Sequence, residues 1–271
     1  MTDTPPASGA YPKIDTTVPH SARIWNYWLG GKDNYAVDRE AGDQFLQTFP
    51  DIAVVARTTR AFQTRAIRYL AGDAGIRQFL DIGTGLPVAD STHEVAQQVA
   101  PNSRIVYVDN YPVVLLHAQT LLTGTAEGAT DYVDADLREP ERILREAGRT
   151  LDFTRPVAVM LIGVMGHIVD DGQAQSIARQ LRESVVPGSY LLLSDGTNVI
   201  RGDQGEAAQE DYNESGAAPY ALRSPDQLGR FFSGLELVEP GMVSVTRWRP
   251  AVGSAGLPAE VDAFGGVGRK P

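Results

Sequence analysis

Cysteine is absent from the 271 residues of this chain. Its absence excludes disulfides, thiolate metal sites and a cysteine nucleophile, and it removes the usual reason to expect secretion. Long hydrophobic runs are missing too, because the longest apolar segment, 156–164, is far shorter than the roughly 20 residues that cross a bilayer. The Pro-, Ser- and Thr-rich N-terminus is not typical of a signal peptide. We therefore expect a cytoplasmic protein with no membrane partner, and we assign no metal site.

Basic residues are few relative to acidic ones. The chain has 24 Lys and Arg against 34 Asp and Glu, which gives a formal net charge of -10. Residues 1–75 carry eight side chains of each sign, so the acidic excess lies in the rest of the chain. Such a chain repels phosphate backbones, and we expect no nucleic acid as a partner.

The N-terminal quarter of the chain predicts helices and no strand. We expect residues 1–15 to be a disordered tail and residues 16–75 to form an N-terminal helical cap. Its first helix should be capped by Ser21 and stopped by Gly30 and Gly31, and two more should cover 38–50 and 51–72.

Strands and helices alternate after residue 75. Apolar strands are predicted at 78–82, 104–109, 130–134, 157–162 and 189–194, separated by helices at 90–99, 112–122, 140–147 and 173–185. This alternation predicts an α/β fold, a parallel doubly wound sheet with helices on both faces, in one domain over 76–271.

The C-terminal part breaks this rhythm. The polar, acidic segment 196–219 predicts an insertion that is partly helical, and Ser224 with Pro225 predicts the start of a short helix. We expect a strand at 235–238, its hairpin partner at 243–248, and a last edge strand at 264–269.

The segment 79–87 is the most informative motif. An apolar strand ends in Asp81-x-Gly83-x-Gly85 and leads directly into a helix, so a ligand can approach the backbone at the carboxyl edge of the sheet. A dinucleotide fingerprint fails because Val88 replaces the third glycine, and no Gly-Lys-Ser/Thr follows to make a P-loop. A carboxylate here suits an ammonium or sulfonium ligand. The alternative is an ordinary tight turn.

Acidic residues also end the next two strands. Asp109 can hold both hydroxyls of a ribose, and Asp136 with its neighbouring backbone amide can meet an adenine edge. Each acid alone fits a helix cap equally well. Together with Asp81 at one sheet edge, they favour a nucleoside-binding site.

These features resemble the class I S-adenosylmethionine-dependent methyltransferases. A narrower resemblance, over about residues 15–271, is to the actinobacterial S-adenosyl methyltransferase family that was once classed as a domain of unknown function. It rests on the segments 22–35, 79–87, 93–96, 106–114, 223–224 and 235–250. Two positions depart from the family pattern, namely Tyr111 in place of an acid and the segment 163–167.

The resemblance implies a Rossmann-like, seven-stranded sheet with an N-terminal helical segment, and S-adenosyl-L-methionine as cofactor. The cofactor-binding residues that it implies are Asp81, Gly83, Thr84, Gly85, Asp109, Asn110, Asp136, Leu137 and Gly163.

The loop after the first predicted helix is unusually polar. Two glycines are followed by Lys32, Asp33, Asn34 and Tyr35, and such a loop can close over the donor, with Lys32 or Arg23 paired to its carboxylate. We assign Arg23, Tyr27, Gly31 and Lys32 to cofactor binding on this reasoning. The alternative is a helix C-cap with solvated charges.

His167 is the candidate catalytic base, because it follows the fourth predicted strand and the chain has only four histidines. A structural role is the alternative for His167, and we expect it for His93 and His117, which fall inside predicted helices. Direct methyl transfer needs such a base only where the acceptor must lose a proton.

The sequence therefore predicts an S-adenosyl-L-methionine-dependent methyltransferase that acts on a small-molecule acceptor. The alternative is a non-catalytic module that binds the donor or another nucleoside, and a nicotinamide oxidoreductase is disfavoured by Val88. Neither the acceptor nor the oligomeric state follows from the sequence.

Overall fold

The structure is a computed structural model that describes residues 14–87, 90–111, 113–114, 124–250 and 257–271. Most of the predicted tail, most of the helix predicted at 112–122, and with it His117, lie outside these ranges. In the part of the chain that the structure describes, no helix is long and apolar enough to cross a membrane.

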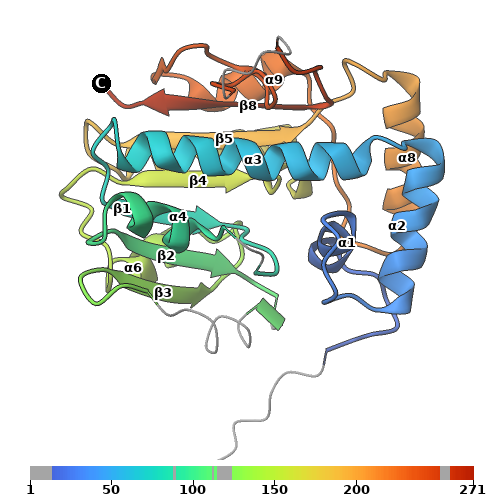
Figure 1. Cartoon of the computed structure of the whole chain (residues 1–271), viewed down its shortest axis with the longest axis horizontal. Helices are drawn as coiled ribbons and strands as arrows, with labels where there is room; N and C mark the ends of the chain where they lie inside the picture. The colour runs from blue at the N-terminus through green and yellow to red at the C-terminus, as the bar shows by residue number, and fades with distance from the viewer. Residues whose placement is uncertain (1–13, 88–89, 112, 115–123, 251–256) are drawn as a thin grey trace, which may run out of the picture.

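The centre of the fold is one mixed sheet in the strand order β3-β2-β1-β4-β5-β8-β6, with β7 also paired to β8. In the described residues the sheet thus has eight strands rather than the seven expected, because the short strand β7 adds to β8. The first five strands of the chain are parallel, as predicted, and their carboxyl ends point the same way (Figure 1). Their bounds are β1 Gln78–Ile82, β2 Arg104–Asp109, β3 Ala129–Asp134, β4 Ala158–Ile162 and β5 Tyr190–Gly196.

Helices cover both faces of this sheet. Successive strand residues point to opposite faces, so Phe79 packs with the helix α3 on one side and Leu80 with α6 and α7 on the other. Figure 1 shows α3 and α4 on the near face, with α6 behind. The helices are α1 Ser21–Trp28, α2 Ala36–Thr48, α3 Ile52–Ala71, α4 Thr92–Val99, α6 Pro140–Ala147, α7 Asp171–Glu183, α8 Asp203–Glu214 and α9 Pro225–Gly229, with short 3-10 turns η1 Met165–His167 and η2 Arg230–Phe232.

Two predictions for the C-terminal strands are wrong. β8, Ala263–Arg269, is an interior strand, antiparallel to β5, and β6, Glu236–Leu237, pairs with β8 rather than with β7, Val243–Ser244. The glycines of β8 allow this strand to lie in the interior of the sheet. A Cβ at Gly265 would lie 2.7 Å from the Cβ of Ser194, so the bare backbone lets β8 pack against its neighbours.

The N-terminal helices α1 and α2 lie beyond the carboxyl ends of the strands, together with α8 from the predicted insertion (Figure 1). The N-cap of α1 is His20, not the predicted Ser21, because the Nδ1 atom of His20 accepts the backbone N–H of Ala22. Gly30, with φ +82°, ends α1 as expected.

A buried ion pair joins α1 to α2, and a hydrogen bond from the same arginine reaches the segment that follows β2. The Arg23 guanidinium lies 2.9 Å from the Asp38 carboxylate, and the two side chains are 2% and 0% exposed. The same guanidinium donates to the Tyr111 hydroxyl at 2.9 Å, beyond the end of β2. Because the pair is dry and satisfied, removing one partner leaves an uncompensated buried charge.

We predict that Arg23→Met lowers the free energy of unfolding by about 3–5 kcal/mol, since Asp38 then loses its partner. Urea denaturation followed by circular dichroism measures this change. Arg179→Met is the matched control, because the Arg179–Glu183 pair is 55% and 64% exposed and should contribute less than about 0.5 kcal/mol. Equal effects of the two substitutions would contradict the structural role of Arg23.

Candidate active site

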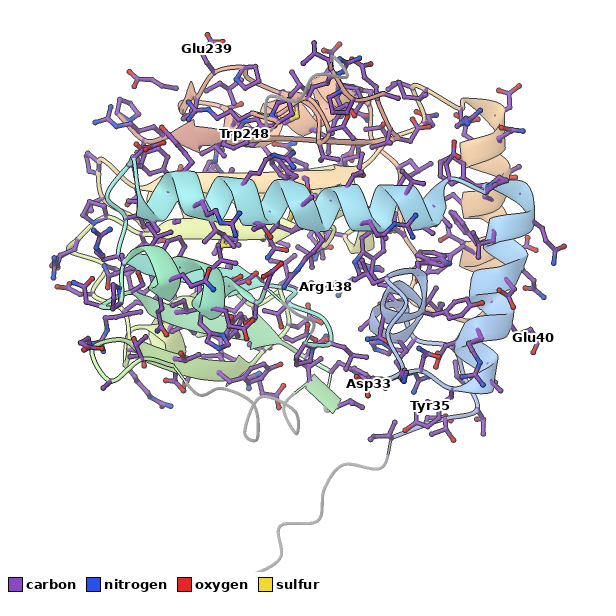
Figure 2. The ribbon with its side chains drawn as sticks, viewed as in Figure 1. Asp33, Tyr35, Glu40, Arg138, Glu239 and Trp248 are labelled. Carbon is purple, nitrogen blue, oxygen red and sulfur yellow. The ribbon has the colours of Figure 1, made fainter. Side chains whose placement is uncertain are left out.

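A cavity of about 410 Å³ lies at the carboxyl edge of the sheet, between the strand ends and helices α1, α2, α3 and α8. Figure 2 shows Arg138 at this edge, facing α1. Ten of the predicted site residues line the cavity: Asp81, Gly83, Thr84, Gly85, Asp109, Asn110, Asp136, Leu137, Gly163 and His167.

Glycines bring bare backbone to the cavity. Gly83, Gly85 and Gly163 have φ of +75°, +62° and +67°, in the left-handed region that other residues adopt only with strain. A Cβ at Gly83 would lie 2.3 Å from Cγ2 of Val164, whereas nothing lies within 4 Å of a Cβ at Gly85 or Gly163. Gly83 is thus needed for packing, and the other two leave open space for a ligand.

Asp81 is a buried carboxylate at the end of β1, with 4% exposure. Burial raises its pKa to about 6, against the opposing effects of the Thr92 hydroxyl and the Arg60 charge. Thr92 donates to Oδ2 at 2.6 Å. Among the described residues no donor is bonded to Oδ1 of Asp81, so this oxygen remains available to a cationic ligand.

Asp109 and Asp136 occupy the neighbouring strand ends. Asp109 accepts the backbone N–H of Gly85 at 2.8 Å and that of Tyr111 at 3.0 Å, which ties the glycine turn to β2. Burial raises the pKa of Asp109, against these amide bonds. Asp136 accepts from the Asn110 side chain at 2.8 Å. The three acids predicted to share one edge therefore do so.

His167 ends the turn η1 after β4. Its Nδ1 lies 3.0 Å from the Pro219 carbonyl oxygen, which can only accept, so Nδ1 carries the proton and Nε2 keeps its lone pair. Desolvation lowers the pKa of His167, against that carbonyl bond, and favours a neutral ring. A neutral imidazole with a lone pair on Nε2 has the form that a general base requires.

Sequence reasoning missed the residues that hold this turn in place. Asp195, at the end of β5, accepts the backbone N–H of Gly166 at 3.0 Å and the hydroxyl of Tyr220. Arg223 donates to the carbonyls of Met165 and Ile168. Asp195 has the same signal as Asp81, an acid at the end of an apolar strand, and burial raises its pKa to about 6 as well.

Arg23 and Tyr27 do not line the cavity, in contrast to their predicted role. Arg23 uses its guanidinium in the buried network with Asp38 and Tyr111. Tyr27 donates its hydroxyl to Asp43 at 2.6 Å, on α2. Both side chains thus fasten α1 to its surroundings, and neither belongs to the cavity lining.

Gly31 and Lys32 also lie away from the cavity lining, and Lys32 is exposed. Gly31 is required by packing, since a Cβ there would lie 2.3 Å from the Asn26 side chain. Asn26, which does line the cavity, accepts from the Asp33 backbone and the Asn34 side chain at 3.1 and 3.0 Å. The polar loop is therefore held in place by Asn26.

Comparison with known proteins shows which family the chain belongs to. The family model described as S-adenosyl methyltransferase matches residues 7–271. The chain belongs to this S-adenosyl methyltransferase family. A search of curated proteins gives no match.

Two solved structures are similar to this methyltransferase over nearly its whole length. One is a DUF574 family protein from Streptomyces avermitilis, with 45% identity, a TM-score of 0.91, and coverage of 96% of this chain and 100% of that one. The other is a protein from Thermobifida fusca assigned as a methyltransferase, with 36% identity, a TM-score of 0.87, and coverage of 97% and 99%.

The family's cofactor is S-adenosyl-L-methionine, and the cavity has the chemistry to accept it. The molecule is cationic at its sulfonium and amino groups and carries a ribose. Asp81 offers a buried carboxylate oxygen, without a bonded donor among the described residues, to the positive charge of the cofactor. Gly85 and Gly163 leave open space next to it. The residues present therefore fit the group.

We predict that Gly83→Ala lowers the free energy of unfolding by at least about 2 kcal/mol, because it adds backbone strain and forces Val164 to move. Gly85→Ala is the matched control. It has the same strain but open space, and it should cost only about 1 kcal/mol. Thermal unfolding of the two variants measures the difference, and a larger loss for Gly85→Ala would show that this packing description is wrong.

Proposed function

We propose that this methyltransferase transfers a methyl group to a small molecule bound in the cavity, with the donor held along β1, β2 and β3. The observation that carries the proposal is the meeting of Asp81, Asp109 and Asp136 with the open glycine turns in one cavity.

Each part of the donor has a matching group in this proposal. Asp81 holds the amino group of the methionine part, and the Gly83 to Gly85 turn allows its close approach. Asp109 accepts from the ribose hydroxyls, and Asp136 with Leu137 meets the adenine edge. Thr84, Asn110 and Gly163 complete the lining. When bound, S-adenosyl-L-methionine supplies a methyl group already activated by positive sulfur.

His167 acts as the general base where the acceptor is an oxygen or nitrogen acid. The Pro219 carbonyl accepts from Nδ1–H and orients the ring, and Arg138 donates to the backbone carbonyl of His167 at 2.9 Å, which holds the backbone of the turn. Nε2 then takes the proton that the acceptor loses. The rest of the rate enhancement comes from holding the two reactants in line.

The enclosed position of the cavity supports a small-molecule acceptor. Helices α1, α2 and α8 lie across the end of the sheet (Figure 1), and the cavity between them is about 410 Å³. The net charge of -10 opposes binding to a nucleic acid. We therefore propose that the acceptor enters as a free molecule.

S-adenosylhomocysteine binding should weaken as the pH falls through about 6, because Asp81 is then protonated and loses its attraction for the amino group. Above that pH the carboxylate is charged and affinity is highest. Calorimetric titrations from about pH 8 to about pH 5 measure the change. Asp81→Asn, which keeps the side-chain shape, should weaken binding about 10- to 100-fold at neutral pH and remove this dependence.

Adenosine is the matched control ligand, since it lacks the amino acid part that Asp81 contacts. The affinity of the protein for adenosine should be the same above and below pH 6, and the same in Asp81→Asn as in the wild type. No detectable binding of either S-adenosylmethionine or S-adenosylhomocysteine to the wild-type protein would refute the proposed function.

His167→Gln should slow methyl transfer at least about 100-fold while leaving S-adenosylhomocysteine affinity within about threefold, because only the proton transfer is lost. The measurement uses donor with an isotopically labelled methyl group and a small-molecule extract of actinobacterial cells. His93→Gln is the control. His93 is buried on α4, 2.9 Å from the Tyr107 hydroxyl, and does not line the cavity. Unchanged transfer in His167→Gln would exclude His167 as the base.

A further inference from the structure

The cavity extends beyond the proposed donor site into a part walled by aromatic rings. Trp25 and Trp28 of α1, Phe45 of α2 and Tyr212 of α8 form this aromatic wall. Ring centroids are 5.9 Å apart for Trp25 and Trp28, 5.0 Å for Trp28 and Phe45, and 6.1 Å for Phe45 and Tyr212. The rings thus form a continuous surface across three helices, which suits a flat, apolar ligand.

Two hydroxyl groups without partners lie on the sheet side of the same cavity. Thr59 of α3 and Ser194 of β5 are 5% and 0% exposed, and both line the cavity. Neither Oγ1 of Thr59 nor Oγ of Ser194 has a hydrogen-bond partner among the described residues. Buried hydroxyls are nearly always bonded, so this pair requires a ligand or a water as partner.

The two hydroxyls belong to one layer, between α3 and β5. A Cβ at Gly265 would lie 2.7 Å from Ser194 Cβ and 2.9 Å from the ring of Phe62, which is one helical turn after Thr59. Both side chains therefore face the space between the helix and the sheet, next to the end of β5. The proposed donor site, at β1 to β3, is separated from this end by β4.

The charges on this side of the cavity are negative. Asp195 and Asp262 line it near the ends of β5 and β8. The described arginines that line the cavity are engaged elsewhere, since Arg60 donates to the Asp90 carbonyl and the Gln63 side chain, and Arg138 pairs with Asp136. An anionic ligand at this end would face the carboxylates of Asp195 and Asp262, and the cation next to Asp195, Arg223, is bonded to the Met165 and Ile168 carbonyls and does not line the cavity.

We propose that this end of the cavity binds the methyl acceptor, and that the acceptor is an aromatic molecule without negative charge whose polar group bonds to Thr59 and Ser194. This inference rests on the proposed function and adds the chemical class of the substrate. The aromatic wall selects a flat ring, the two hydroxyls orient it, and Asp195 and Asp262 exclude anions.

Four ligands of similar size test the proposal on the protein saturated with S-adenosylhomocysteine. They are phenethylamine, 2-phenylethanol, phenylacetate and 2-cyclohexylethanol, and calorimetry measures the affinity of each. Phenethylamine and 2-phenylethanol should bind at least about tenfold more tightly than phenylacetate, because like charges repel in a dry site. 2-Phenylethanol should also bind more tightly than 2-cyclohexylethanol, which has the hydroxyl but no flat ring.

Two substitutions test the hydroxyls. Thr59→Val and Ser194→Ala should each lower the affinity for 2-phenylethanol about three- to tenfold and leave the affinity for S-adenosylhomocysteine unchanged. Neither should lower the melting temperature, because neither hydroxyl has a partner within the described structure. Thr58→Val is the matched control on the same helix. Its hydroxyl bonds to the Val54 carbonyl at 2.8 Å, away from the cavity lining, and ligand affinity should not change.

Each failure has a distinct meaning. If S-adenosylhomocysteine binds but phenylacetate binds as tightly as the other ligands, or none of the four binds, the acceptor class is wrong and the methyltransferase proposal stands. Unchanged 2-phenylethanol affinity in both Thr59→Val and Ser194→Ala also overturns the inference. If S-adenosylhomocysteine itself does not bind, the proposed function fails first.

Discussion

Parallel pairing of β1 to β5 is the constraint on which the rest of this structure depends. Parallel strands all end at one edge, so residues far apart in the chain meet there without any local signal that joins them. Asp81, Asp109 and Asp195 come from three different strands and face one cavity. The turns that leave the strands must bend sharply toward helices, and left-handed glycines at positions 83 and 163 allow this without strain.

Buried negative charge is the cost of this arrangement. Asp81 and Asp195 are 4% and 3% exposed, and this desolvation raises the pKa of each carboxyl to about 6. Each is stabilised by one hydroxyl, that of Thr92 for Asp81 and that of Tyr220 for Asp195. A site of this kind is preorganised for positive charge, since a cationic ligand supplies what the folded chain lacks.

The helical cap converts this open edge into an enclosed cavity. α1 and α2 contribute an aromatic surface, and the ion pair between Arg23 and Asp38 joins these two helices to each other. Tyr111 links this ion pair to Asp109, because its hydroxyl accepts from Arg23 and its backbone N–H donates to Asp109. Tyr111 thus joins α1 and α2 to the end of a strand.

Local sequence patterns were sufficient to predict the parallel part of the sheet. The apolar strands, the Asp-x-Gly-x-Gly turn and the acids at strand ends are read from adjacent residues, and these elements agree with the structure. The C-terminal strands were predicted wrongly because pairing between β5 and β8 joins residues that are 67 to 79 positions apart in the chain, such as Tyr190 and Arg269. The role of the glycines in β8 is also non-local, because Gly265 is required by its close approach to Ser194 on β5.

The sequence by itself determined the chemistry at the strand ends, and with it the expectation of a cationic nucleoside ligand. Only the tertiary structure decided which polar residues reach the cavity. It pairs Arg23 with Asp38 and Tyr220 with Asp195, and it gives the hydroxyls of Thr59 and Ser194 no hydrogen-bond partner among the described residues. The physical reason is that side-chain pairing and burial depend on contacts between distant segments, which residue type and local spacing do not contain.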